Sequence, residues 1–150
     1  MPNHCWNTLT VIGHEADLNA LLESEFMFSA FLPIPAEIER TGRESTEWCW
    51  KHWGTKWEHW DYEKTHESPN ECQVRFTTAW NPPYAYLRHV LERFPRCWLK
   101  LTFKTEADEA GVWIAYNWKG SLVEQKMLWF EPMPALTSLG EIYIPPDLAD

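Results

Sequence analysis

The stretch Glu71–Lys104, ECQVRFTTAWNPPYAYLRHVLERFPRCWLKLTFK, decides the fold class. Its first part, Glu71–Ala79, is rich in β-branched and aromatic residues and predicts a strand. A helix is expected to follow, because Asn81 is a favoured N-cap and Pro82 is favoured at the first helical position. Pro95 ends this helix, since proline disrupts the hydrogen bonds of a helix interior.

The segments around this helix extend the pattern. Cys97–Lys104 alternates, which predicts a strand that turns every second residue inward. The inward residues are Cys97, Leu99, Leu101 and Phe103. Cys5–Ile12 predicts the first strand of the chain, and Glu15–Glu23 predicts a short amphipathic helix. Val112–Trp118 and Leu122–Phe130 are expected to form a final hairpin.

The region between the first helix and the opening stretch is less regular. Phe26–Pro35 is apolar but broken by two prolines, so an extended segment is expected. Glu37–Glu47 is polar and indicates a loop or a frayed helical turn, and Trp48–Trp53 indicates a single helical turn. Trp57–Glu63 is expected to be a strand that pairs with Glu71–Ala79.

The order of these elements predicts an α+β fold. We expect a ferredoxin-like split β-α-β sandwich, in which an antiparallel sheet carries two helices on one face and extra C-terminal strands. Residues 1–130 would form this domain, and 131–150, which are rich in proline, would form a tail packed on it or extending from it. Glu141–Ile144 would add a short edge strand, which could pair with a second copy of the chain in a homo-oligomer.

Composition and charge exclude several classes of function. The chain has 150 residues, of which 45% are hydrophobic, and a formal net charge of −9. An acidic surface repels nucleic-acid backbones and anionic lipids, so neither general DNA or RNA binding nor membrane binding is expected. No apolar run approaches the ~20 residues of a membrane span, and the first residues lack the pattern of a secretory signal. A cytoplasmic location is therefore expected.

Cysteines and histidines give no sign of a metal or catalytic centre. Four cysteines lie far apart in the sequence and are expected to be reduced, buried thiols: Cys5, Cys49, Cys72 and Cys97. His52, His59 and His66 recur every seven residues, but Gly54 interrupts the helix that would align them. Cys49 beside His52 lacks an orienting acid. No metal, cofactor or catalytic residue is therefore assigned.

Tryptophan is the unusual component of this chain. There are 11 tryptophans, and five of them lie in one short stretch: Trp48, Trp50, Trp53, Trp57 and Trp60. An indole has a large apolar face and one N–H group, so it suits half-buried clusters and binding surfaces. We therefore look for a site around this aromatic stretch.

The segment WGTKW, Trp53–Trp57, is expected to join a helical turn to a strand. Gly54 would supply a positive φ, and Lys56 would place a cation beside two indoles. If the following strand pairs with Glu71–Ala79, Trp80 reaches the same end of the sheet, near helix-start N–H groups that could hold a phosphate. The candidate ligand- or partner-binding residues are Trp53, Thr55, Lys56, Trp57, Trp80, Asn3, Asn7, Trp50 and Trp60.

Three interpretations of these residues stay open. The indoles at the joints of the sheet could be structural, with the Lys56 stem laid across them. They could instead hold a nucleotide between two rings. In the third interpretation, rings such as Trp48, Trp50, Trp60 and Trp118 anchor a protein partner. Asn7 is expected to be a hydrogen-bonded polar group of the core.

Three motifs carry a resemblance to a known family. They are Pro2-Asn3-x-Cys5-x-Asn7-x-Leu9-x-Val11-x-Gly13, Trp53-Gly54-Thr55-Lys56-Trp57 and Phe76-x-Thr78-Ala79-Trp80-x-Pro82-Pro83. In this order they resemble the YubB-like family of small phage and plasmid proteins. The resemblance spans residues 2–104 and implies a ferredoxin-like domain and a mobile-element origin, without a known activity. Trp6, the Cys49–His66 stretch and the C-terminal tail depart from the family pattern, so a specialised function is expected there.

These features predict a non-enzymatic accessory protein of a phage or mobile element. It would be a counter-defence inhibitor in the host bacterial cytoplasm that binds a host defence protein or sequesters a signalling nucleotide through a tryptophan-rich surface. One alternative is a small enzyme acting on a nucleotide, with His52, Glu58, His59 and Asp61 as acid and base. Another is an acidic mimic of DNA, because acidic residues outnumber basic ones most strongly in the first half of the chain.

Overall fold

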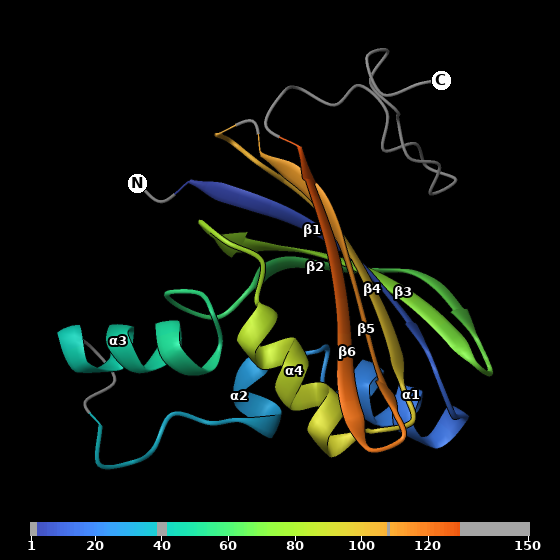
Figure 1. Ribbon diagram of the computed structural model, residues 1–150. Helices are drawn as coiled ribbons and strands as arrows, with labels where there is room; N and C mark the ends of the chain where they lie inside the picture. Colours follow the sequence, from blue (N-terminus) through green and yellow to red (C-terminus); the bar gives the residue numbers. More distant parts are fainter. Residues whose placement is uncertain (1–2, 39–41, 108, 130–150) are drawn as a thin grey trace.

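Six strands form one antiparallel sheet in the order β2-β3-β1-β4-β5-β6 (Figure 1). The computed structural model describes residues 3–38, 42–107 and 109–129. The strands are β1 (His4–Ile12), β2 (Trp60–Ser68), β3 (Glu71–Ala79), β4 (Trp98–Thr105), β5 (Ala110–Trp118) and β6 (Ser121–Trp129). The predicted tail at 131–150, with its edge strand Glu141–Ile144, lies outside the described residues.

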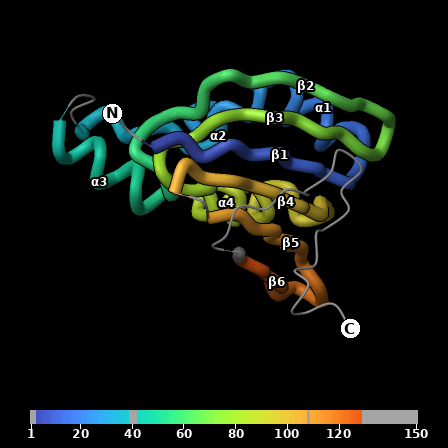
Figure 2. Tube along the Cα trace, turned by 90° about the horizontal axis from the view of Figure 1, so that it is seen from above, coloured from blue at the N-terminus to red at the C-terminus, as the bar shows by residue number. Residues whose placement is uncertain are grey.

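Most of the helices lie on one face of this sheet. They are α1 (Glu15–Glu23), α2 (Phe28–Phe31), α3 (Arg43–His52) and α4 (Tyr84–Arg93). Figure 2 shows the strands side by side in the order given above, with α1, α2 and α4 beneath the sheet and α3 beyond one of its ends. The fold is therefore α+β, with a sheet that carries its helices on one side.

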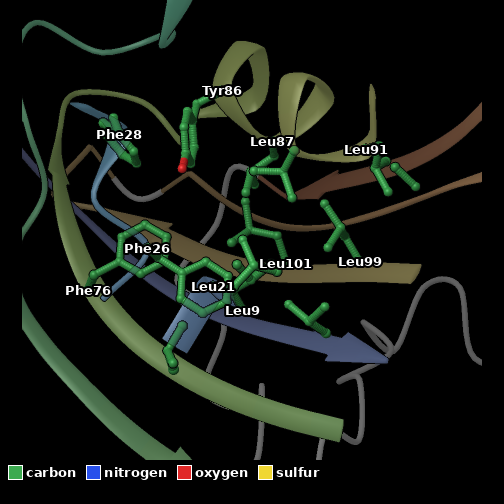
Figure 3. Packing of buried hydrophobic residues seen from close by; sticks show 14 of the residues in the cluster. Leu9, Leu21, Phe26, Phe28, Phe76, Tyr86, Leu87, Leu91, Leu99 and Leu101 are labelled. Atoms are coloured by element: carbon green, nitrogen blue, oxygen red, sulfur yellow. The ribbon is translucent and has the colours of Figure 1, made fainter. Parts of the chain in front are cut away.

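The core fills the space between the sheet and the helices. Residues at odd positions of β1 and β4, such as Leu9 and Leu101, are fully buried there. Leu87 and Leu91 of α4 point toward these strands (Figure 3). The inward set predicted for β4 is confirmed, because Cys97, Leu99, Leu101 and Phe103 are all buried. Alternation along a strand places these residues on one face.

Two helical segments differ from the prediction. Phe26–Pro35 contains the short helix α2, whose first amides at Phe28 and Ser29 donate to the Glu58 carboxylate at 2.7 and 3.0 Å. Helix α3 spans ten residues, where a loop or frayed helical turn followed by a single helical turn was expected. The α3 helix buries Ser45 and Cys49, which lie one turn apart. Packing of this face compensates for a weak local helix signal.

Two boundaries near the aromatic stretch also differ from the prediction. The strand β2 begins at Trp60 and not at Trp57, because His59 turns into the helical layer, where its Nε2 lies 3.0 Å from the Glu25 carbonyl oxygen. Helix α4 begins at Tyr84, so the expected N-cap at Asn81 is wrong. The two prolines before Tyr84 lie ahead of the helix.

Candidate functional site

Three of the predicted site residues are core residues. Trp53 is 3% exposed, and its indole N–H donates to the Leu32 carbonyl oxygen at 2.9 Å. Thr55 is fully buried and donates to the Trp57 carbonyl oxygen. The Asn7 amide, buried between strands, donates to the carbonyl oxygens of Cys5 and Phe76 and to the Thr78 hydroxyl. These side chains stabilise the fold and are almost completely shielded from solvent.

The predicted phosphate position at the start of α4 is filled by the chain itself. Gly54 has a φ of +85°, and a Cβ built on it would lie 3.3 Å from the amide nitrogens of both Tyr84 and Ala85. The Tyr86 amide donates to the Trp53 carbonyl oxygen at 3.3 Å. Only glycine fits this approach, because it has no side chain and tolerates a positive φ. The first turn of α4 is therefore covered by backbone and does not offer free N–H groups to a phosphate.

The other predicted residues lie around one end of the sheet. Trp50, Trp57 and Trp80 are exposed, and the Lys56 ammonium lies 5.9 Å from the Trp57 ring centre. The Trp80 amide donates to the Asn3 carbonyl oxygen at 2.8 Å. Within the described residues, these three indoles make no ring contact with one another. They are separate exposed rings and do not form a two-ring clamp.

Trp60, the last predicted residue, belongs to a different surface. It is half-buried on β2 and pairs in register with Thr77 of β3. Its ring lies 5.4 Å from the His4 ring, which in turn makes an edge contact with Trp6. This cluster lies on the face of the sheet opposite the core, and no helix of the described chain covers that face.

The helix-free face carries exposed aromatic and aliphatic side chains that the sequence reasoning did not assemble. Trp6 of β1 and Trp98 of β4 are 45% and 46% exposed. Trp98 stacks on Tyr116 of β5, with ring centres 3.9 Å apart and planes within 6°. Ile12 and Met127 are also exposed on this face. Alternation along the strand predicted that Trp98 points outward. It could not predict that these residues share one surface, because this depends on the order of the strands in the sheet.

A depression of about 440 Å³ is hollowed into this face between β1, β3 and β2. Its lining includes Trp6, Thr8, Asp61, Glu63, Arg75 and Thr77, and we call it the Trp6 depression. The register explains the grouping, since Thr77 pairs with both Trp6 and Trp60, and Arg75 pairs with both Thr8 and Glu63. A register shift between Trp60 and Glu63 makes the wall of the depression irregular.

Titratable groups on the core side are not arranged for catalysis. Burial raises the pKa of the Cys5 thiol to about 12 and that of the Cys49 thiol to about 11, which disfavours the nucleophilic thiolate. Burial lowers the pKa of His59, whose Nδ1 has no hydrogen-bond partner in the described part of the chain. Among residues 3–38, 42–107 and 109–129, no three His, Cys, Asp or Glu side chains are placed to hold a metal ion.

The acid and base residues considered for an enzyme lie apart. His52 stacks on Trp48 with ring centres 4.5 Å apart, and Glu58 binds the first amides of α2. His59 is buried in the helical layer, whereas Asp61 lines the Trp6 depression on the other side of the sheet. The structure therefore does not bring these four residues into one site.

Comparison with known proteins gives no relatives for this chain. No protein-family model, curated protein or solved structure matches it. None of the helices in the described ranges has the length and apolar character needed to span a membrane.

Proposed function

We propose that this chain is a non-catalytic binding protein that docks a protein partner on the helix-free face of its sheet. The observation that carries the proposal is the exposure of Trp6 and Trp98 on this face, on the neighbouring strands β1 and β4. The two rings lie near opposite ends of these strands, and Trp98 lies beside Ile12 and stacks on Tyr116. Exposed apolar groups that gather on a surface commonly mark interaction sites. Tryptophan is enriched among residues that dominate protein–protein binding energy, because its ring buries a large area with little loss of conformational freedom.

A protein partner is favoured over a small signalling nucleotide. The nucleotide hypothesis required free amides at the start of α4, and Gly54 covers them. Trp53, one of the two rings expected to hold a base, is buried. A broad face with separate exposed rings suits a protein surface better than one planar base. The resemblance to the YubB-like family implies a mobile-element origin, and for a protein of that origin we infer a bacterial defence protein as the partner and its inhibition as the biological role.

We also infer that the first four strands form a ferredoxin-like unit with α1 and α4. The order β2-β3-β1-β4, with antiparallel pairing throughout, supports this inference. β3 separates β1 from β2, which is the arrangement of a split β-α-β unit. In this description α2 and α3 are insertions between α1 and β2, and the hairpin of β5 and β6 widens the sheet.

Affinity capture from bacterial lysate tests the docking face. The bait would be the wild-type chain, a Trp6→Ser/Trp98→Ser variant, and a Trp50→Ser control that changes an exposed indole on α3. We expect a protein that wild type and control retain equally and that the double variant loses at least about tenfold, the loss that corresponds to 1.4 kcal/mol. Circular dichroism would verify that all three are folded.

Other outcomes contradict this proposal. Equal capture by all three baits, or a loss confined to Trp50→Ser, would exclude the helix-free face as the docking surface. Quenching of tryptophan fluorescence by a nucleotide, undiminished in the double variant, would favour the nucleotide-sequestering alternative.

A further inference from the structure

The Trp6 depression combines one aromatic wall with charged groups of both signs. Trp6 is nearly half exposed on β1, and Asp61 and Glu63 come from the edge strand β2. Arg75 lies between Glu63 and Thr8 in the register. Lys104 of β4 pairs with Trp6 in the register and adds a cation on the other side. Both carboxylates come from β2, so the β2 side of the depression complements a cation.

The backbone of β2 is deformed where it supplies the carboxylates. Asp61 has a φ of +53°, which is uncommon for a residue other than glycine. Two residues, Asp61 and Tyr62, occupy the shift in register between Trp60 and Glu63, and Tyr62 packs toward the core. The bulge thus leaves Asp61 to line the depression. Such bulges re-aim side chains and are frequent next to binding sites.

The charged groups of the depression do not form ion pairs with one another in the part of the chain that the structure describes. Within the described residues, Arg75 forms no ion pair with Asp61 or Glu63. Thr77 also lines the depression. The carboxylates of Asp61 and Glu63 are therefore available to an incoming donor.

We propose that the Trp6 depression receives the guanidinium group of an arginine side chain. This inference rests on the proposed function, because the arginine would belong to the protein partner. A guanidinium is planar, so it can lie on the Trp6 ring while its N–H groups donate to the carboxylates of Asp61 and Glu63. An ammonium group offers neither the planar face nor the fork of donors. Arg75 opposes the incoming cation and limits its affinity.

A small probe tests the chemistry without knowledge of the partner. N-acetyl-arginine amide would be titrated into the ¹⁵N-labelled full chain at low, constant ionic strength. The Trp6 indole N–H signal would be assigned by its disappearance in Trp6→Phe. We expect this signal to shift in a saturable manner at millimolar probe, the range of a weak single-residue contact. N-acetyl-lysine amide should bind severalfold more weakly.

Charge variants separate this inference from other ligands. Asp61→Asn/Glu63→Gln should weaken arginine binding by at least about tenfold, because it removes both charged acceptors. Glu71→Gln, at the far end of β3, is the matched control and should bind as wild type does. Arg75→Gln should strengthen binding. If Asp61→Asn/Glu63→Gln does not fold, Glu63→Gln alone tests the same point with a smaller loss.

The results that overturn this inference are distinct from those that overturn the docking function. An unshifted Trp6 signal, equal binding by the double variant, or binding abolished by Arg75→Gln would each exclude an arginine site. If lysate capture still required Trp6 and Trp98 in that case, the docking face would stand without the arginine. If arginine bound as expected but the Trp6→Ser/Trp98→Ser variant captured the partner as well as wild type does, the arginine site would be supported and the proposed docking function would be wrong.

Discussion

The two faces of the sheet are built from the same strands, but one face buries its side chains under helices and the other leaves them exposed. On the helical face of β4, Leu101 is fully buried beneath α4. Its neighbour Thr102 lies on the opposite face. Lys100 and Lys104 lie on the same face as Thr102, two residues before and after it on β4. Adjacent positions therefore report separately on packing and on surface chemistry. Substitutions one residue apart can test stability and binding independently.

The faces also differ in how they satisfy polar groups. On the helical face, the Asn7 amide donates to three acceptors and is nearly inaccessible. On the open face, Gln73 donates to the Thr10 hydroxyl at 3.2 Å, whereas Arg75 lines the Trp6 depression without forming an ion pair in the described ranges. Polar groups that hold a fold together are paired internally, whereas those that serve binding stay available. This difference locates the candidate site better than the number of tryptophans does.

The largest expected effect is on packing of the helical face. Leu101→Ala should lower the free energy of unfolding by about 2–5 kcal/mol, because it leaves a cavity under α4. Thr102→Ala, one residue along, should cost less than about 1 kcal/mol. Urea denaturation followed by circular dichroism measures both values. Similar losses for the two variants would show that the open face is packed as tightly as the helical one.

A smaller effect is expected from pH. Burial lowers the pKa of His59 below its usual value of 6.5. Below about pH 6.5, His59 is therefore protonated more readily in the unfolded chain than in the folded chain. The contribution of His59 to the free energy of unfolding should fall as the pH decreases below this value, by at most about 1.4 kcal/mol per pH unit. At higher pH, His59 is neutral in both states and should not affect the free energy of unfolding.

His66, exposed on β2, provides the control for this pH dependence. His59→Gln should lose the His59 contribution to the slope between pH 5 and 7, measured by urea denaturation, whereas His66→Gln should retain it. An unchanged slope in His59→Gln would mean that His59 does not stay neutral inside the folded chain.

The smallest effect is expected on the open face. Trp98→Phe keeps an aromatic ring against Tyr116 and should change the free energy of unfolding by less than about 0.5 kcal/mol. Thermal unfolding measures this change, and partner capture with the same variant measures its effect on binding. A loss of stability as large as that of Leu101→Ala would assign Trp98 to the core, contrary to its exposure.

Much of the sheet could be predicted because its signals are local. Glu15–Glu23 and Glu71–Ala79 form the helix and strand that were expected, with the same ends. The inward residues of β4 follow from alternation alone. The six-stranded antiparallel sheet with helices on one side agrees with the α+β prediction. Periodicity over eight or nine residues was enough in each case.

What escaped prediction depends on residues far apart in the chain. The amides that begin α2 are held by Glu58, thirty positions from Phe28. Gly54 lies against the start of α4, and no local pattern indicates its approach to the Tyr84 amide. The Trp6 depression exists because β3 lies between β1 and a bulged β2. Strand order and bulges are tertiary properties, so a single sequence read locally does not reveal them.

The irregular pairing of β2 has a consequence for the behaviour of the protein at high concentration. Its register shifts twice, and its side chains include Asp61, Glu63, Lys64 and Glu67. A straight, uncharged edge strand templates fibril growth, whereas a kinked and charged one does not. Removal of Asp61 would take out one of the two register shifts and one of these charges, so this border would become straighter and less charged. The chain would then lose a recognition feature and become more prone to edge-to-edge aggregation through one change.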